Sequence, residues 1–521
     1  MVLAVGEPDS EAASGDQTGA SHSLNAGHIR GSSLLLLGRV VALCLSGATQ
    51  VIIVRYLSKS DYGAFAYALT VASFIELIAT IVHRQSLTRF LSLYEEERDY
   101  DKLFGTIIMV MGLIFATALS LFAFVLALRS PLTGAVGGSL VMRIVLIMFA
   151  LGALEAIDDV FEGMFAVFSR PRAIFFRKYL LTPMLQLAIA SVTVIGGHGV
   201  EFLAIGTVVG WAIAVAVYFV TLLTTLRDRG LLEHFRLRRL SYPIVEVFGF
   251  GIPLITTQLV FLCTNTISVI LLENMKGTTE VARLRAILPL ADLNQLVIFT
   301  FTLLFMPMAA RLFIRGDHEG MRSAYWESAI WLAVLSFPLF AMTGPLARSL
   351  TLTLFGERYV GSASVLAVLS IGFYFSAALG FNALTLQTYG RLRFVAIVNM
   401  GCVIVDLILT IALIPPFGAL GVAIATCATL VVQNLANQFG LRREVGIPVF
   451  ERRFRRVYAT IAFVAIALAL IQMTLQPPLV GALAIAAVAS LAILVVNRRL
   501  LNVAETFPEL TRVPLLRALL R

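Results

Sequence analysis

The chain has 521 residues, of which 59% are hydrophobic and 14% are charged, with a formal net charge of +9. Charged residues form roughly 25% of a typical soluble domain, so this chain lacks the polar surface that a large soluble protein needs. The bilayer is therefore the expected solvent, and the positive charge is interpreted as a topology signal and not as affinity for nucleic acid. The four cysteines lie in apolar segments without metal-ligand spacing, and we expect no cofactor: Cys44, Cys263, Cys402 and Cys427.

Continuous apolar stretches follow one another along nearly the whole chain. Residues 1–30 are polar and carry early acidic groups, so we expect a disordered cytoplasmic tail there and not a signal peptide. About 20 apolar residues cross a bilayer as a helix. The chain is accordingly predicted to be an all-α, polytopic membrane protein with about fourteen transmembrane helices, at 31–57, 62–88, 103–128, 140–166, 177–197, 201–226, 244–273, 281–311, 327–350, 360–388, 394–414, 418–440, 456–475 and 478–497.

The basic residues alternate between the connections of these helices. Most of the 40 Lys and Arg residues fall in the even-numbered connections and at the two ends, for example in Arg170-Pro171-Arg172 and Arg236-Leu237-Arg238-Arg239. Cytoplasmic loops of membrane proteins carry the excess of Lys and Arg. Both termini are therefore predicted to be cytoplasmic, in the cytoplasmic (inner) membrane of the cell.

An internal repeat divides the chain. Residues 195–207 resemble residues 414–426, with Gly199 matching Gly418 and Thr207 matching Thr426. The two segments are six helices apart, so the repeats keep the same topology and are parallel. We expect two six-helix lobes and two further helices, arranged as a tail (1–30), an N-terminal lobe (31–240), a C-terminal lobe (241–441), helices thirteen and fourteen (442–500), and a cytoplasmic tail or interfacial helix (501–521).

Several segments carry a resemblance to a known group of transporters. These are residues 55–63 (RYLSKSDYG) at the turn after expected helix one, 250–253 (FGIP) at the entry to helix seven, 354–359 (LFGERY) at the entry to helix ten and 413–426 (LIPPFGALGVAIAT) at the turn between helices eleven and twelve. The chain resembles the polysaccharide-export and oligosaccharide-lipid flippase branch (Wzx-like) of the multidrug/oligosaccharidyl-lipid/polysaccharide exporter superfamily. The segment at 280–285 (EVARLR) departs from the pattern with which the family's helix eight opens.

This resemblance implies a function. A member of the branch moves undecaprenyl-diphosphate-linked oligosaccharide across the cytoplasmic membrane by alternating access, as a precursor of surface polysaccharide. The implied partners are the lipid-linked oligosaccharide, the bilayer, a polysaccharide polymerase and other envelope-assembly proteins. The chain shows no phosphate-binding loop and no nucleophile motif, so we expect a transporter and not an enzyme.

Arginines inside the expected helices are the candidates for binding the diphosphate headgroup. Arg39 lies about ten residues into helix one, and Arg283 and Arg285 lie at the outer end of helix eight. An arginine near the bilayer centre costs about 2.5–3.5 kcal/mol on insertion scales, so such residues suggest function. The structural alternatives are an interhelical salt bridge for Arg39, and snorkelling to the interface for Arg283 and Arg285.

Acidic residues inside the helices are the candidates for cavity charges or for coupling to H⁺ or Na⁺. They are Glu76 on helix two, Glu155 and Asp159 on helix four, Asp292 on helix eight and Asp406 on helix eleven. Arg285 and Asp292 are seven residues apart and share a helix face. Structural pairing with basic residues is an equally good explanation of these acids.

Three other functions compete with the oligosaccharide flippase. A cation-coupled drug efflux antiporter of the same superfamily would favour an acidic cavity. A lipid II flippase would be expected to add further arginines on helix one, where this chain has the apolar Leu45. A polysaccharide polymerase or ligase would need a large outer loop, and the outer connections are all short.

Overall fold

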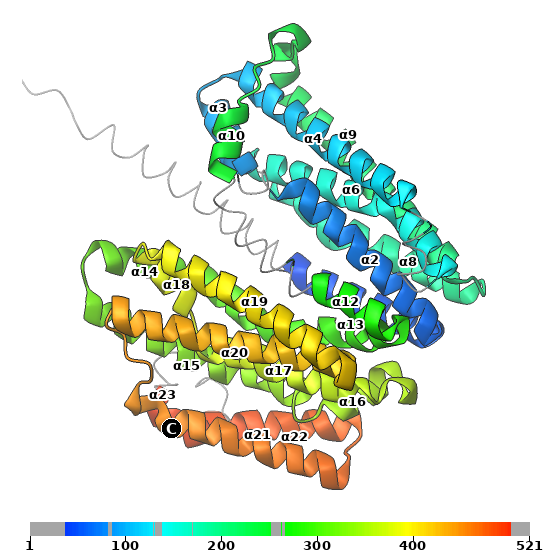
Figure 1. Cartoon of the computed structure of the whole chain (residues 1–521). Helices are drawn as coiled ribbons and strands as arrows, with labels where there is room; N and C mark the ends of the chain where they lie inside the picture. The colour runs from blue at the N-terminus through cyan, green and yellow to red at the C-terminus, as the bar shows by residue number, and fades with distance from the viewer. Residues whose placement is uncertain are drawn as a thin grey trace, which may run out of the picture. The chain divides into compact units, whose positions relative to one another are not determined.

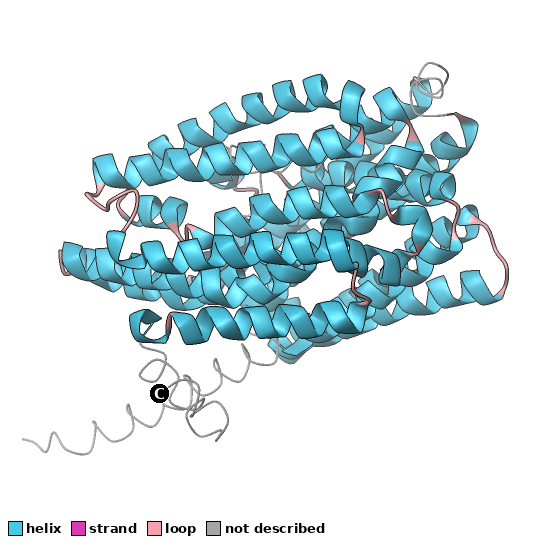
Figure 2. Cartoon of the chain, turned by 90° about the horizontal axis from the view of Figure 1, so that it is seen from below, coloured by secondary structure: helices cyan, strands magenta, loops and turns pink. Residues whose placement is uncertain are grey.

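The computed structural model describes residues 37–81, 86–128, 130, 138–168, 170–251, 262 and 266–501. Within them the chain folds into helices joined by short loops, and no strand is present (Figure 2). Hydrocarbon offers no hydrogen-bond partner, so a spanning segment satisfies its backbone N–H and C=O groups internally by forming a helix. The expected polar tail and, after Leu501, the expected interfacial segment lie outside the described residues.

Thirteen described helices are long and apolar enough to cross a membrane. They confirm the all-α polytopic class. The fourteenth expected span, 244–273, lies partly outside the described residues. Expected helix eight consists of α13 (Thr278–Asp292), the 3-10 turn η6 (Leu293–Gln295) and α14 (Leu296–Ile314), with Pro289 inside α13, four residues before η6, and Pro307 inside α14. Proline removes a backbone donor and clashes with the preceding turn, which breaks or kinks a helix.

The helices form two compact units (Figure 1). Unit 1 comprises Met1–Ile52, Val82–Ala118 and Ala153–Gly251. Its helices, some of which continue into unit 2, are the first helix (Leu37–Tyr56), α3 (Ser86–Glu96), α4 (Tyr100–Ala127), α6 (Ser139–Val167), α7 (Pro171–Ile174), the π-helical η1 (Phe175–Leu181), α8 (Thr182–Ile195), α9 (Val200–Asp228), η2 (Leu231–His234), η3 (Leu237–Arg239) and α10 (Ile244–Gly251).

Unit 2 comprises Ile53–Ile81, Leu119–Gly152 and Ile252–Arg521. Besides α13, η6 and α14, it contains α2 (Lys59–Thr80), α12 (Ser268–Lys276), α15 (His318–Thr343), α16 (Ala347–Phe355), η7 (Glu357–Tyr359), α17 (Ser362–Ala378), α18 (Asn382–Thr388), α19 (Leu392–Phe417), α20 (Ala419–Glu444), η8 (Arg452–Phe454), α21 (Arg455–Leu475), α22 (Leu479–Val496) and α23 (Arg498–Leu501).

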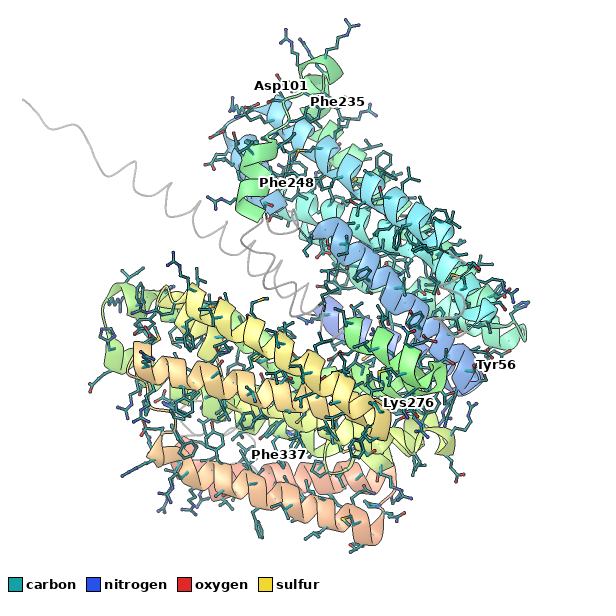
Figure 3. All side chains as sticks on the ribbon, viewed as in Figure 1. Tyr56, Asp101, Phe235, Phe248, Lys276 and Phe337 are labelled. Carbon is teal, nitrogen blue, oxygen red and sulfur yellow. The ribbon has the colours of Figure 1, made fainter. Side chains whose placement is uncertain are left out.

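The core of unit 2 is built around α15. Trp326 and Phe337 are fully buried on this helix, and Phe337 is labelled in Figure 3. The hydroxyl of the buried Tyr325 lies 2.6 Å from Gln438 Oε1 on α20, and that of Tyr374 on α17 donates to the carbonyl of Ala333 at 2.8 Å. Aromatic side chains thus fill the space between helices, while their hydroxyl groups are satisfied by neighbouring polar groups.

The segments 55–63 and 354–359 lie at the same junction of unit 2. Arg358 donates to the carbonyls of Arg55 at 2.5 Å and Leu57 at 3.4 Å, at the end of the first helix. Arg55 in turn donates to the carbonyls of Thr353 at 2.5 Å and Leu354 at 2.8 Å, at the end of α16. The last carbonyls of a helix lack intrahelical partners and carry partial negative charge. Arg358 therefore caps the first helix, which contains Arg55, and Arg55 caps α16, which precedes Arg358.

Helices α2 and α13 pack closely within unit 2. A Cβ atom at Gly63 on α2 would lie 1.9 Å from the carbonyl oxygen of Thr278, the first residue of α13. Only the absence of a side chain at Gly63 allows this approach. The contact sets the separation of the two helices one turn before Tyr67 and two turns before Thr70.

We expect Gly63→Ala to destabilise the protein because the added methyl group would force α2 and α13 apart. Overpacking of this kind costs about 1–3 kcal/mol. Gly401→Ala on α19 is the matched control, since a Cβ there meets nothing within 4 Å. Thermal unfolding in detergent should show a lower melting temperature for Gly63→Ala alone. Equal melting temperatures for the two variants would contradict the close approach.

Candidate substrate and coupling sites

Arg285 lies in the interface between α13 and α2. Its Nη2 donates to Thr70 Oγ1 at 2.7 Å, and the side chain is half-buried. The carboxylate of Asp292, at the end of α13, and the ring hydroxyl of Tyr62 also influence its charge. Arg285 is thus held between two membrane-spanning helices, with the hydroxyl of Thr70 as a hydrogen-bond partner and the carboxylate of Asp292 in electrostatic contact.

Arg283, two residues earlier, has a different environment. It pairs with Glu280 at 2.6 Å, and its side chain is 39% exposed. The other oxygen of Glu280 accepts from the backbone N–H of Ala419 at 2.9 Å, at the start of α20. Glu280 therefore caps α20 and compensates Arg283 at the same time. Arg283 and Arg285 are close in the sequence, but their side chains have different partners: Glu280 for Arg283 and Thr70 for Arg285.

The remaining predicted cavity residues are spread over both units. Arg39 is exposed on the first helix and Glu76 is half-buried on α2. On α6, Glu155 and Asp159 are half-buried, and Asp292 is exposed at the end of α13. Asp292 is placed beside a predicted headgroup residue, through its electrostatic interaction with Arg285.

The acidic face of α6 contains a buried ion pair that sequence reasoning did not single out. Asp158, 4% exposed, hydrogen-bonds Arg177 of η1, which is 2% exposed. The guanidinium also lies over two rings of α9, at 4.9 Å from the centroid of Trp211 and 4.7 Å from that of Tyr218. Cation–π contacts of this kind strengthen when they are desolvated. The sequence shows both charges, but the contact between them depends on how η1 turns against α6.

Asp406 is a buried acidic group of unit 2. It is fully buried on α19, with the hydroxyls of Ser268 on α12 and Thr429 on α20 nearby. Neither carboxylate oxygen has a partner in good hydrogen-bond geometry, and in the described part of the chain no cationic side chain pairs with it. A buried carboxylate is costly unless a proton or a cation neutralises it. Carboxylate and hydroxyl oxygens are ligands that hard cations accept.

Glu273 is a second buried carboxylate, and the sequence analysis missed it. It is 2% exposed on α12, both of its oxygens lack a hydrogen-bond partner among the described residues, and Tyr67 of α2 is close enough to feel its charge. The residue stands where an expected span ends, so the sequence favoured a solvated position. Its apolar neighbours in Val269-Ile270-Leu271-Leu272 were the only available signal of burial.

The comparison with known protein families gives one match of wide coverage. A sequence profile of the polysaccharide biosynthesis protein family matches residues 29–313. An uncharacterised membrane protein of Methanocaldococcus jannaschii is 22% identical over 420 residues, which cover 76% of this chain and 80% of that protein.

Solved structures share the fold at low sequence identity. The lipid II flippase MurJ in an inward closed conformation superposes with a TM-score of 0.65 at 13% identity, over 91% of this chain and 99% of that one. A multidrug resistance MATE family transporter of the MOP superfamily, in an inward-facing conformation, gives a TM-score of 0.61 at 14% identity, over 78% and 94%. The MATE transporter VcmN of Vibrio cholerae gives 0.52 at 14%, over 81% and 98%.

We expect Asp158→Asn to destabilise the protein because it leaves the buried Arg177 without its counter-charge. Breaking one side of a buried pair costs about 3–5 kcal/mol. Glu162→Gln is the matched control, since its pair with Lys178 at 2.7 Å is partly exposed, and such pairs contribute about 0–1 kcal/mol.

Chemical unfolding followed by circular dichroism measures both variants. The double variant Asp158→Leu with Arg177→Met should recover part of the loss, since no unpaired buried charge remains. Similar losses for Asp158→Asn and Glu162→Gln would show that the buried pair has no special role.

Proposed function

We propose that the cargo of this chain, which belongs to the polysaccharide biosynthesis protein family, is an undecaprenyl-diphosphate-linked oligosaccharide. The chain is a multi-pass membrane transporter of the MOP superfamily and not an enzyme. It would move this cargo from the cytoplasmic to the outer leaflet by alternating access. The family supports a lipid-linked glycan as the substrate class. A polysaccharide polymerase and other envelope-assembly proteins are the partners that such a cargo would require, and both termini would be cytoplasmic.

The charge of the cargo is the reason for assigning a role to Arg285. A diphosphate carries about two negative charges, and a bare ion buried in hydrocarbon costs tens of kcal/mol on continuum estimates. The transporter must supply cations along the path. Arg285 lies on a membrane-spanning helix with a neutral hydroxyl, Thr70, as its hydrogen-bond partner at 2.7 Å. This position inside the membrane-spanning part of unit 2 carries the proposal, because a guanidinium can form charge-assisted bonds with a phosphate.

Arg39 and Arg283 would act before and after Arg285. Arg39 is exposed on the first helix, where an approaching headgroup could contact it. Arg283 is partly exposed and bound to Glu280, so a phosphate would compete with that carboxylate for it. Competition of this kind favours release at the outer end, since a strongly held phosphate would not leave.

We propose that Asp406 couples transport to a cation, either Na⁺ or H⁺. Its carboxylate is fully buried among hydroxyls from two neighbouring helices. A cation bound there would draw α12, α19 and α20 together, and its departure would leave a buried charge that favours rearrangement. Glu76, Glu155 and Asp159 are half-buried, and we assign them supporting roles as charges that adjust the affinity for the cargo.

A drug efflux antiporter is the second candidate, favoured by the acidic face of α6 and by the fold shared with a multidrug resistance transporter. A strain lacking the protein would distinguish the two. Loss of surface polysaccharide with unchanged drug susceptibility supports the flippase. Drug hypersensitivity with intact polysaccharide supports the antiporter.

We expect Arg285→Gln to reduce polysaccharide export by roughly tenfold or more, since a charge-assisted contact with phosphate contributes about 1.5–3 kcal/mol. Arg285→Lys should retain part of the activity, because it keeps the charge without the fork of donors. Arg39→Gln should act in the same direction. The measurements are surface polysaccharide and accumulated lipid-linked oligosaccharide in cells of matched expression.

Arg315→Gln is the matched control for this series. Arg315 follows α14 directly and is exposed, so its loss should leave export unchanged. Normal export by Arg285→Gln would remove Arg285 from the path. Equal loss by all variants, the control included, would point to expression or folding instead.

We expect Na⁺ to raise the melting temperature of the purified protein by a few degrees at constant ionic strength, relative to choline, if Na⁺ is the coupling ion. Asp406→Asn should abolish this rise, and Glu319→Gln, an exposed acid of α15, should preserve it. If H⁺ is the coupling ion, the melting temperature would respond to pH in the parent protein and less so in Asp406→Asn. No difference between Asp406→Asn and the parent under either titration would refute the coupling role.

A further inference from the structure

Unit 1 contains an apolar groove between α4, α6 and α9. Its volume is about 620 Å³, within the range of roughly 300–1,000 Å³ found for ligand sites. Every side chain that lines it is apolar, including Phe104 and Phe115 of α4, Phe161 of α6, and Ala212, Ala216 and Phe219 of α9. Phe115 is 59% exposed and Phe219 is 49% exposed, so the groove is open along its length and is suited to a hydrocarbon chain.

The length of the groove matches one leaflet of the bilayer. The lining extends from Phe104 to Phe115 on α4 and from Ala212 to Leu226 on α9, which corresponds to about 16 Å and about 21 Å at 1.5 Å per residue. Half of a hydrocarbon core is about 15 Å thick. An acyl chain of a phospholipid in one leaflet therefore fits the groove from end to end, whereas a polyprenyl chain is much longer than the groove.

One end of the groove adjoins a group of arginines. Phe235 lines this end, and Arg236, Arg238 and Arg239 follow it with exposed side chains. Figure 3 shows Phe235 at the same end of unit 1 as Asp101, which lies next to the start of α4. By the positive-inside pattern, this end is the cytoplasmic one.

Arg236, Arg238 and Arg239 are able to bind an anion. In the described part of the chain, none of Arg236, Arg238 and Arg239 forms an ion pair. The nearby acids are Asp101 and Glu233, together with Asp228, which is bound to Arg170 at 3.7 Å. Three exposed positive charges without an ion pair among the described residues thus lie beside the end of the groove that Phe235 lines. Basic pockets beside transmembrane helices on the cytoplasmic side are known to bind anionic lipid headgroups.

We propose that this groove binds one anionic phospholipid of the cytoplasmic leaflet, with an acyl chain against α4, α6 and α9 and the phosphate at Arg236, Arg238 and Arg239. The site is separate from the transport path proposed above, and no step of transport depends on it. A lipid bound there would hold the three helices together at one end of unit 1. Two features of one ligand, its chain and its charge, match two adjacent features of the groove.

Native mass spectrometry of the delipidated, full-length protein tests this site. Phosphatidylglycerol and phosphatidylcholine with identical acyl chains are the probes. We expect one phosphatidylglycerol to bind at concentrations where phosphatidylcholine does not. The triple variant Arg236→Gln, Arg238→Gln and Arg239→Gln should bind it roughly tenfold more weakly or worse, as attraction to anionic lipid falls with each lost charge. Equal binding of both lipids would overturn the proposal.

Matched variants separate the groove from general effects. Ala212→Phe and Ala216→Phe fill the groove from α9, where both alanines are exposed, and each should weaken phosphatidylglycerol binding. Ala188→Phe, on an exposed position of α8 outside the groove, should not. The triple variant Arg442→Gln, Arg443→Gln and Arg452→Gln removes the same charge from exposed positions of unit 2 and should also bind normally. Weakening by the two controls would overturn the proposal.

Competitors identify the ligand. Glycerol phosphate, which has the charge without the chain, should not displace bound phosphatidylglycerol at equal concentration. Undecaprenyl phosphate should also displace it poorly, because its chain exceeds the groove. Displacement by glycerol phosphate at equal concentration would show a simple anion site and contradict a phospholipid site. Displacement by undecaprenyl phosphate at equal concentration would show a site for the polyprenyl carrier and would contradict it as well. Because binding is measured without transport, failure here leaves the flippase proposal unaffected.

Discussion

Hydrocarbon provides no hydrogen bonds to the backbone, and the rest of this structure follows from that constraint. The described chain consists of helices with short connections, which satisfies the backbone within each span. The constraint is hardest to meet at helix ends, where carbonyls and N–H groups lack partners. Here side chains from distant segments supply them. Arg55 binds the final carbonyls of α16, Arg358 binds those of the first helix, and Glu280 accepts the first N–H of α20.

The same low polarity makes every buried charge informative. Asp158 and Arg177 neutralise one another inside unit 1, with two aromatic rings against the guanidinium. Such a pair needs no ligand to explain it. Arg285, which has a hydroxyl partner, and Asp406, which has hydroxyls nearby and no cation among the described residues, are different. Arg285 can bind an anion from within a membrane-spanning helix and Asp406 can bind a cation, which is why they carry the proposals on cargo and coupling.

Much of the fold was predictable, whereas little of the site was. Spans of suitable length were evident because an apolar run long enough to cross a bilayer is a signal contained within one segment. The 3-10 turn within expected helix eight was less evident, although Pro289 lies one turn before it. Arg283 and Arg285 looked equivalent in sequence, yet one pairs with Glu280 and the other reaches α2. Glu273 and Asp158 were overlooked because a residue near the end of a span is buried or solvated according to its neighbours.

By itself, the sequence determined the solvent of this protein, its helical class and the residues at its turns, because these depend on composition and on short local patterns. Only the tertiary structure decided which charges meet. It brought Arg285 to Thr70, Arg177 to Asp158 and Ser268 to Asp406, and it aligned the apolar faces of α4, α6 and α9 beside an arginine group. The physical reason is that electrostatic and packing energies depend on distance in space, and residues remote in the chain become neighbours only when the helices pack.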